Sequence, residues 1–235
     1  YKKCRNLTTP VYEKQKICSP VERTSHESEI EFVNVSFKYP NTQKYALKNV
    51  SIRIKTGERL SVVGYNGAGK TTFIKLICRL YEPTEGKILF NGQDISELNY
   101  DDYREKISVV FQDFAMFDFS IQENIVLNRR LDIDLLNRSV QDSGLSGKLS
   151  ELKNGLDTVI GKNLFADGVD LSGGETQKVA SARAYYKNAD VVILDEPTAA
   201  LDPIAENQLY ERFNNIITNK TAIYISHRLA SVRFC

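Results

Sequence analysis

Apolar and polar residues alternate at the beginning of the ordered part of the chain, a pattern typical of strands that bury one face. Ile30 and Phe32 follow one phase of this alternation, and Val33, Val35 and Phe37 follow the opposite phase. Because one extra residue in a strand shifts its phase, the pattern predicts a strand with a bulge or a strand that switches its buried face.

Short strand patterns and helical patterns follow one another along the rest of the chain. Apolar residues predict further strands at 50–54, 59–63, 87–90, 107–111, 190–194 and 221–225, and we expect the one at 59–63 to be buried. Helical spacing is found at 73–80, 121–127, 135–140, 176–186 and 204–217. A helical block from about 113 to 188 therefore interrupts a strand-rich frame, and we expect an α/β core with a helical insertion.

The composition excludes few functions. Of 235 residues, 42% are hydrophobic and 26% are charged, and 31 basic residues almost cancel 30 acidic ones. A net charge of +1 gives no support for a nucleic-acid-binding surface, which needs a basic excess or patch. The four cysteines are far apart in the sequence, so reduced thiols in a cytosolic protein are favoured over a metal site.

The first 28 residues differ from the rest. Residues 1–28 are polar and contain Pro10 and Pro20, so we expect a linker from a preceding domain, with a disordered tail as the alternative. One domain is expected over 29–235. The chain starts with Tyr1 and has no apolar run of membrane-spanning length and no signal segment. Because the first residue is Tyr1 and not Met, we expect the chain to be cut from a longer protein.

The segment from Gly64 to Thr71, Gly-Tyr-Asn-Gly-Ala-Gly-Lys-Thr, matches the complete P-loop pattern. An apolar strand pattern precedes it and an amphipathic helix pattern follows it. Its glycines allow backbone N–H groups to surround a polyanion, and the helix adds its positive N-terminal end. We expect Lys70 to contact the β- and γ-phosphates of a nucleotide and the Thr71 hydroxyl to bind Mg²⁺.

Two acidic residues follow the aliphatic run Val191–Leu194, which is typical of a central parallel strand. Open α/β sheets bind ligands at the carboxyl ends of their strands. We expect Asp195 to support Mg²⁺. Because side chains alternate along a strand, Glu196 would point elsewhere and act on an attacking water. A solvated acidic turn is the alternative for this pair.

A glycine-containing motif opens the helix expected at 176–186. Ser172 and Glu175 form a capping box, and a simple helix cap would explain these two residues alone. The whole run from Leu171 to Gln177, however, resembles the signature of the ATP-binding domains of ABC transporters. In that family the signature contacts the γ-phosphate of ATP held by the P-loop of a second domain. The signature residues are Leu171, Ser172, Gly173, Gly174 and Glu175.

Further matches occur in the order found in this family. Tyr39 resembles the aromatic residue that stacks on adenine, although a packed tyrosine is the alternative. Gln112 resembles the glutamine that senses Mg²⁺, and His227 resembles the histidine that contacts the γ-phosphate. The loop for communication across the dimer is expected at Ala200, Leu201 and Asp202.

The resemblance implies a P-loop NTPase core with an antiparallel β subdomain and an inserted α-helical signature subdomain. It also implies ATP and Mg²⁺ as cofactors. The nucleotide-binding residues would be Tyr39, Gly64, Tyr65, Asn66, Gly67, Ala68, Gly69, Lys70, Thr71, Thr72 and Gln112. The metal-binding residues would be Thr71, Gln112 and Asp195, and the catalytic ones Glu196 and His227.

Residues 117–125 resemble the segment of exporter-type domains that receives the coupling helices of the membrane part. Phe114, Met116, Phe117 and Phe119 would give this groove an apolar lining, or they would pack inside the helical lobe. The signature region resembles that of bacterial peptide and lantibiotic exporters.

The chain departs from the family pattern in two places. The family continues beyond the switch histidine with another pair of strands, whereas this chain stops at Cys235. The loop from Gly161 to Gly168 lacks the glutamate common in multidrug exporters, and we assign no coupling role to Asp167 there.

The expected function is ATP hydrolysis that drives export at the cytoplasmic face of a membrane. The expected partners are a second ATP-binding domain and a transmembrane domain. We expect no nucleic-acid partner. One alternative is a soluble ABC ATPase acting on nucleic acid or ribosomes, against which the near-neutral charge and single set of motifs argue. The other is a non-hydrolysing regulatory module, against which the complete set of key residues argues.

Overall fold

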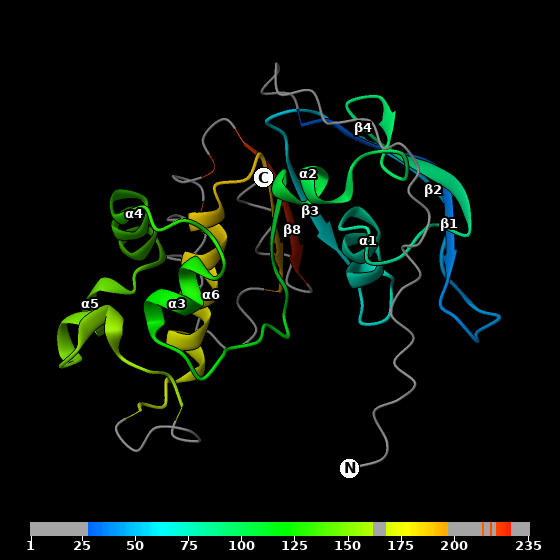
Figure 1. Ribbon diagram of the computed structural model, residues 1–235. Helices are drawn as coiled ribbons and strands as arrows, with labels where there is room; N and C mark the ends of the chain where they lie inside the picture. Colours follow the sequence, from blue (N-terminus) through cyan, green and yellow to red (C-terminus); the bar gives the residue numbers. More distant parts are fainter. Residues whose placement is uncertain (1–27, 162–167, 197–212, 214–216, 218–219, 227–235) are drawn as a thin grey trace, which may run out of the picture.

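The computed structural model describes residues 28–161, 168–196, 213, 217 and 220–226. Figure 1 shows a lobe of helices, α3 to α6, beside a part that contains the strands with α1 and α2. Within the described ranges, none of the helices has both the length and the apolar character needed to cross a bilayer. In chain order the elements are β1 (Ile30–Lys38), β2 (Tyr45–Ile54), β3 (Arg59–Val63), α1 (Lys70–Ile77), β4 (Glu85–Phe90), β5 (Gln93–Asp94), α2 (Tyr100–Glu105), β6 (Ile107–Val110), α3 (Ile121–Val126), α4 (Ile133–Ser143), α5 (Ser146–Glu151), the 3-10 helix η1 (Gly155–Asp157), α6 (Gly173–Lys187), β7 (Val191–Asp195) and β8 (Thr221–Ser226).

The strands form two sheets of different type. One sheet is antiparallel with the order β2-β1-β4-β5, and the other is parallel with the order β3-β8-β7-β6. The pairing of β1 with β2 shifts its register between Phe32 and Val35, and Asn34 between them has a positive φ of 50°. The bulge predicted from the change of phase is therefore confirmed.

Strand β7 lies inside the parallel sheet and is buried on both faces, which explains its continuous apolar run. Val191 and Ile193 pack in one hydrophobic cluster with α1 and the antiparallel sheet. Val192 and Leu194 belong to a second cluster with Ala180 of α6. Successive side chains of a strand point to opposite faces, so a strand covered on both sides needs apolar residues at every position.

Helix α1 packs with both sheets, and the helical lobe has a core of its own. Phe73 of α1 stacks on Phe32 of β1, with ring centroids 4.5 Å apart. The core of the lobe is built from α3, α4 and α6, and includes Ile125 and Val179. A fully buried aliphatic side chain of this kind contributes about 1.5–3 kcal/mol.

Several expectations need correction. Strand β3 is only half-buried, and its last residue, Val63, is exposed. Helix α2 was not expected, although its cap is visible in the sequence: the Asn99 side chain accepts hydrogen bonds from the backbone N–H groups of Asp101 and Asp102. Ser28, assigned to the linker, is buried and its backbone N–H donates to the Thr56 hydroxyl at 2.9 Å.

The other 27 residues of the expected linker lie outside the described residues, as does most of the helix expected at 204–217. Of that helix, Phe213 and Ile217 are described. Both are buried against the parallel sheet, and the Phe213 ring meets Tyr224 edge-on at 5.3 Å.

Candidate functional site

The expected site residues come together at one edge of the parallel sheet. Strands β3, β6, β7 and β8 run in the same direction, so their carboxyl ends lie at the same edge. The P-loop follows β3, Asp195 ends β7, and Gln112 comes two residues after β6. Ser226 ends β8, and His227, the next residue, lies outside the described residues. Residues far apart in the sequence thus share the position where such sheets bind ligands.

The glycines of the P-loop meet a steric requirement as well as a conformational one. Gly67 and Gly69 have positive φ angles of 79° and 91°, which other residues rarely adopt. A Cβ atom at Gly69 would also lie 2.6 Å from the Ala46 carbonyl oxygen and 2.8 Å from a methyl group of Leu47. The loop therefore approaches β2 so closely that only glycine fits at this position.

The amine of Lys70 is held inside the loop. It donates to the backbone carbonyls of Gly64 at 2.7 Å and Tyr65 at 3.1 Å, and it lies 3.8 Å from a carboxylate oxygen of Glu196. The Lys70 side chain is buried, whereas the Tyr65 side chain is 90% exposed, so Tyr65 takes part through its backbone. All partners of the amine are oxygen acceptors that a phosphate group can replace.

Asp195 and Thr71 provide oxygen donors of the kind that Mg²⁺ prefers. Asp195 is 1% exposed, and its Oδ1 has no hydrogen-bond partner among the described residues. Burial raises the pKa of the Asp195 carboxyl, and a hydrogen bond from the Thr71 side chain opposes this shift. A buried carboxylate oxygen without a partner is unfavourable unless a cation or a donor meets it, so this pair fits a magnesium site.

Glu196 differs from Asp195 for a reason that the sequence did not reveal. Alternation along a strand was expected to separate their side chains, but β7 ends at Asp195. Glu196 has a positive φ of 50°, in the left-handed region, and its backbone N–H donates to the Ile225 carbonyl at 3.0 Å. Such backbone strain at a non-glycine residue is concentrated at functional sites. The turn brings the Glu196 carboxylate toward Lys70.

Tyr39 lies beside the first turn of α1. Its hydroxyl is 3.0 Å from the Thr72 hydroxyl, and its ring meets Phe37 and Tyr81 edge-on at 5.0 and 5.3 Å. The packed tyrosine considered as an alternative is thus partly realised. The ring remains half-buried and next to the P-loop helix, and adenine stacking stays a prediction.

The expected signature begins α6 in the helical lobe. Ser172 is the N-cap, and its hydroxyl accepts from the Glu175 backbone N–H at 3.3 Å. The Glu175 carboxylate accepts from the Ser172 backbone N–H at 2.8 Å, so the capping box is confirmed. Ser172 and Gly173 are exposed, and a Cβ atom at Gly173 would meet nothing within 4 Å. This helix end is open to an approaching anion.

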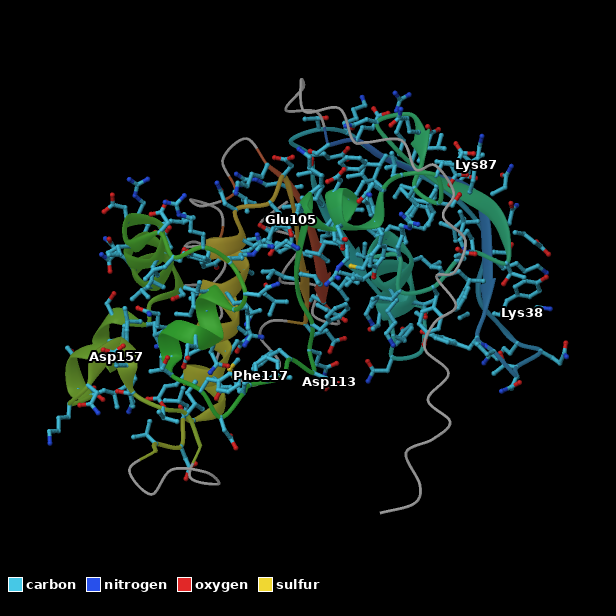
Figure 2. The ribbon with its side chains drawn as sticks, in the orientation of Figure 1. Lys38, Lys87, Glu105, Asp113, Phe117 and Asp157 are labelled. Carbon is cyan, nitrogen blue, oxygen red and sulfur yellow. The ribbon has the colours of Figure 1, made fainter. Side chains whose placement is uncertain are left out.

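The segment after β6 divides into a buried and an exposed part. Figure 2 shows Asp113 and Phe117 on the segment that leads from β6 toward α3. Phe117 and Phe119 are exposed, and their rings stack at 6.1 Å. Phe114 and Met116 instead pack against the buried clusters. Phe114 and Met116 are half-buried, so the packed alternative is favoured for these two, and the groove lining stays a prediction.

Two polar residues that the sequence analysis did not consider hold this segment. Asn124 is fully buried and binds the backbone of Phe117 in both directions, at 3.0 and 2.9 Å. Arg183 of α6 donates to the carbonyls of Asn124 at 2.7 Å and Ala115 at 3.0 Å. An arginine within the small-residue run of α6, from Ala180 to Ala184, was the signal that could have identified it.

A cavity of about 380 Å³ lies where the helical lobe meets the strand-rich part. Leu127 is one of its exposed apolar residues, and its basic residues include Arg104 and Lys187. At this cavity Arg129 forms two hydrogen bonds of 2.7 Å with the carboxylate of Glu105, which is labelled in Figure 2. This ion pair connects α2 to the segment that follows α3.

The three residues expected to communicate across the dimer, Ala200, Leu201 and Asp202, lie outside the described residues. Asp167, to which no coupling role is assigned, lies outside them too.

Comparisons with known proteins agree with this site. Residues 47–199 match the ABC transporter family. The subtilin transport ATP-binding protein SpaT of Bacillus subtilis is 43% identical over 86% of this chain and 33% of its own length. The nisin transport ATP-binding protein NisT of Lactococcus lactis is 38% identical over 88% of this chain and 35% of its own length.

The fold has a solved counterpart. The structure of a bacterial Atm1-family ABC exporter with ATP bound superposes with a TM-score of 0.81 at 31% identity, over 92% of this chain and 38% of that one. The chain thus spans about one third of the length of the relatives that it matches. Because the family match covers more than half of the chain and includes both the P-loop and the signature, the chain belongs to the ABC transporter family, as an ATP-binding domain of exporter type.

Proposed function

We propose that this chain is the ATP-hydrolysing motor domain of an exporter. The observation that carries the proposal is the meeting of Lys70, Thr71, Asp195 and Glu196 at the carboxyl edge of the parallel sheet. This arrangement combines a phosphate-binding amine, a pair of oxygen donors for a cation and a carboxylate placed beside them. The relatives named for transport support the exporter over an ATPase that acts on nucleic acid.

Each residue has a separate role in the proposed reaction. Lys70 and the backbone N–H groups of the P-loop bind the β- and γ-phosphates. Thr71 and Asp195 hold Mg²⁺, which neutralises phosphate charge. Glu196 orients the attacking water and accepts its proton. We also assign the adenine contact to Tyr39, the Mg²⁺-sensing role to Gln112 and the γ-phosphate contact to His227.

The signature is proposed to act on ATP bound to a second ATP-binding domain. Its exposed helix end, with Ser172 and Gly173, presents backbone N–H groups and the positive end of α6 to an anion. Two domains would close head-to-tail around two ATP molecules, with Ala200 to Asp202 at the interface. Hydrolysis would reopen the pair because the products bind the closed state less tightly.

The membrane partner is proposed to dock near the cavity between the two parts of the domain. This cavity combines exposed apolar side chains with arginine and lysine side chains, and the exposed Phe117 and Phe119 follow β6 nearby in the chain. An element seated there would contact both the lobe with the signature and the strand-rich part with the P-loop. Movement of one part against the other would then be passed to the membrane, and the domain would work at its cytoplasmic face.

Nucleotide titration tests the proposal directly. Purified wild type and Lys70→Ala would be titrated with a fluorescent ATP analogue in Mg²⁺, with Lys55→Ala in the exposed turn before β3 as the matched control. We expect Lys70→Ala to lower the affinity about 10- to 100-fold, the range for losing a hydrogen bond to a charged group, and Lys55→Ala to have no effect. Equal affinity in all three proteins would contradict the assignment.

A further inference from the structure

A carboxylate lies beside the helix end that is proposed to meet the γ-phosphate. Glu175 is the third residue of α6, and its Oε2 accepts from the Ser172 backbone N–H. The same carboxylate that completes the capping box therefore brings negative charge to the open end of the helix. A neutral glutamine could form the same cap, so the charge itself has to be explained.

The Glu175 carboxylate is ionised where the signature operates. The hydrogen bond from the Ser172 backbone lowers the pKa of Glu175 most, and a hydrogen bond from Lys148 lowers it further. An ionised carboxylate and a phosphate repel each other, and for charges partly screened by solvent this repulsion is worth roughly a tenfold change in affinity. Without compensation, Glu175 would weaken the binding of ATP in trans.

Lys148 provides that compensation from a different helix. Its amine lies 3.0 Å from Oε1 of Glu175, on the carboxylate oxygen that does not cap the helix. Both side chains are 23% exposed, so solvent screens this pair less than a fully exposed one. The amine also reaches Glu151 at 3.4 Å, but Glu151 is largely exposed. The shorter and less exposed partner of Lys148 is the signature glutamate.

We infer that Lys148 is a positioning residue for the signature: it neutralises Glu175 and so permits the helix end to accept the γ-phosphate of ATP held by the second domain. This inference rests on the proposed function. Lys148 touches no nucleotide and acts through Glu175. The ion pair also connects α5 to the beginning of α6.

A double-mutant cycle in the intact protein separates charge neutralisation from simple support. The variants are Lys148→Met, Lys148→Arg, Glu175→Gln and the combination of Lys148→Met with Glu175→Gln, measured as hydrolysis rate against MgATP concentration. We expect Lys148→Met to raise the KM for ATP about tenfold with a smaller change in kcat, and Lys148→Arg to restore most of the affinity. The double variant should have the KM of Glu175→Gln alone, because no carboxylate is then left to neutralise.

Three controls make the result specific. Lys153→Met removes a positive charge from the same lobe, just after α5, and should leave the KM unchanged. Binding of a fluorescent ATP analogue to the P-loop of isolated domains should be the same in wild type and Lys148→Met. The KM effect of Lys148→Met should also shrink as KCl is raised, since salt screens the repulsion.

The outcomes separate the role inferred for Lys148 from the proposed ATPase function of the domain. If Lys148→Met raises the KM equally whether or not Glu175→Gln is also present, or does not raise it at all, the inference about Lys148 is wrong. If instead the wild-type protein shows no hydrolysis of ATP, the proposed function itself fails.

Discussion

The amine of Lys70 lies 3.8 Å from a carboxylate oxygen of Glu196, although the two residues are far apart in the chain. The same amine donates to two carbonyls of its own loop. A phosphate group that enters the loop competes for this amine. Binding of ATP would therefore draw Lys70 away from Glu196, which is the proposed general base.

Gly69→Ala should destabilise the domain more than a positive φ alone requires. The matched control is Gly57→Ala, because Gly57 has a φ of 74° and open space where a Cβ would be placed. We expect Gly57→Ala to lower the free energy of unfolding by about 1 kcal/mol, from backbone strain. Gly69→Ala should lower it by about 3 kcal/mol, since its Cβ also clashes with the Ala46 backbone. Urea unfolding measures both, and equal losses would contradict the close approach of loop and β2.

Asp195→Asn should stabilise the domain without Mg²⁺ and abolish its stabilisation by Mg²⁺. Burial raises the pKa of Asp195, so the folded state binds a proton that the unfolded chain has already released. This group's contribution to stability therefore falls as pH rises from the ordinary carboxyl pKa through the raised value, and it stays unfavourable above that window. Asparagine removes this penalty.

Thermal unfolding near neutral pH in the presence of ATP, first with EDTA and then with excess Mg²⁺, checks this expectation. The wild type should gain more in Tm from Mg²⁺ than Asp195→Asn does. A wild-type Tm that is indifferent to Mg²⁺, or a variant with a lower Tm in EDTA, would argue against a cation at this carboxylate.

Arg183→Ala should loosen the segment that leads from Gln112 to α3. The substitution removes the arginine donor from the carbonyl of the buried Asn124 and from the carbonyl of the exposed Ala115, and a buried acceptor that loses its partner costs about 1–3 kcal/mol. We expect a loss of about 2 kcal/mol in urea unfolding, with Arg138→Ala on the exposed face of α4 as the control. Hydrogen exchange should rise in 113–120, and unchanged exchange there would mean that Asn124 alone holds the segment.

The sequence predicted the parts of the fold whose pattern is local and periodic. The change of phase in β1, the apolar run of β7 and the capping box at Ser172 each depend on neighbouring residues, and each is present. The P-loop and the acidic pair were found because phosphate chemistry requires particular residues at fixed spacing. The strand order then brought them together, as parallel strands require.

Other features depend on contacts between distant segments and have no local signal. The positive φ of Glu196 follows from its hydrogen bond to Ile225 in the neighbouring strand, which alternation could not reveal. The half-buried state of β3 depends on which elements pack against it, and its own apolar residues do not specify these. The pairing of Lys148 with Glu175 joins two helices across the lobe, and a lysine on a short helix gives no indication of its partner.

The most direct test of the central claim is the rate of phosphate release by Glu196→Gln, measured beside its ATP affinity. Glutamine keeps the size of the side chain but cannot accept the proton of the attacking water. We expect ATP affinity within about twofold of the wild type and hydrolysis reduced about 10²- to 10⁴-fold, the contribution of a general base. Normal phosphate release from this variant would contradict the assignment of Glu196 as the catalytic base, and with it the hydrolytic site built around Lys70 and Asp195.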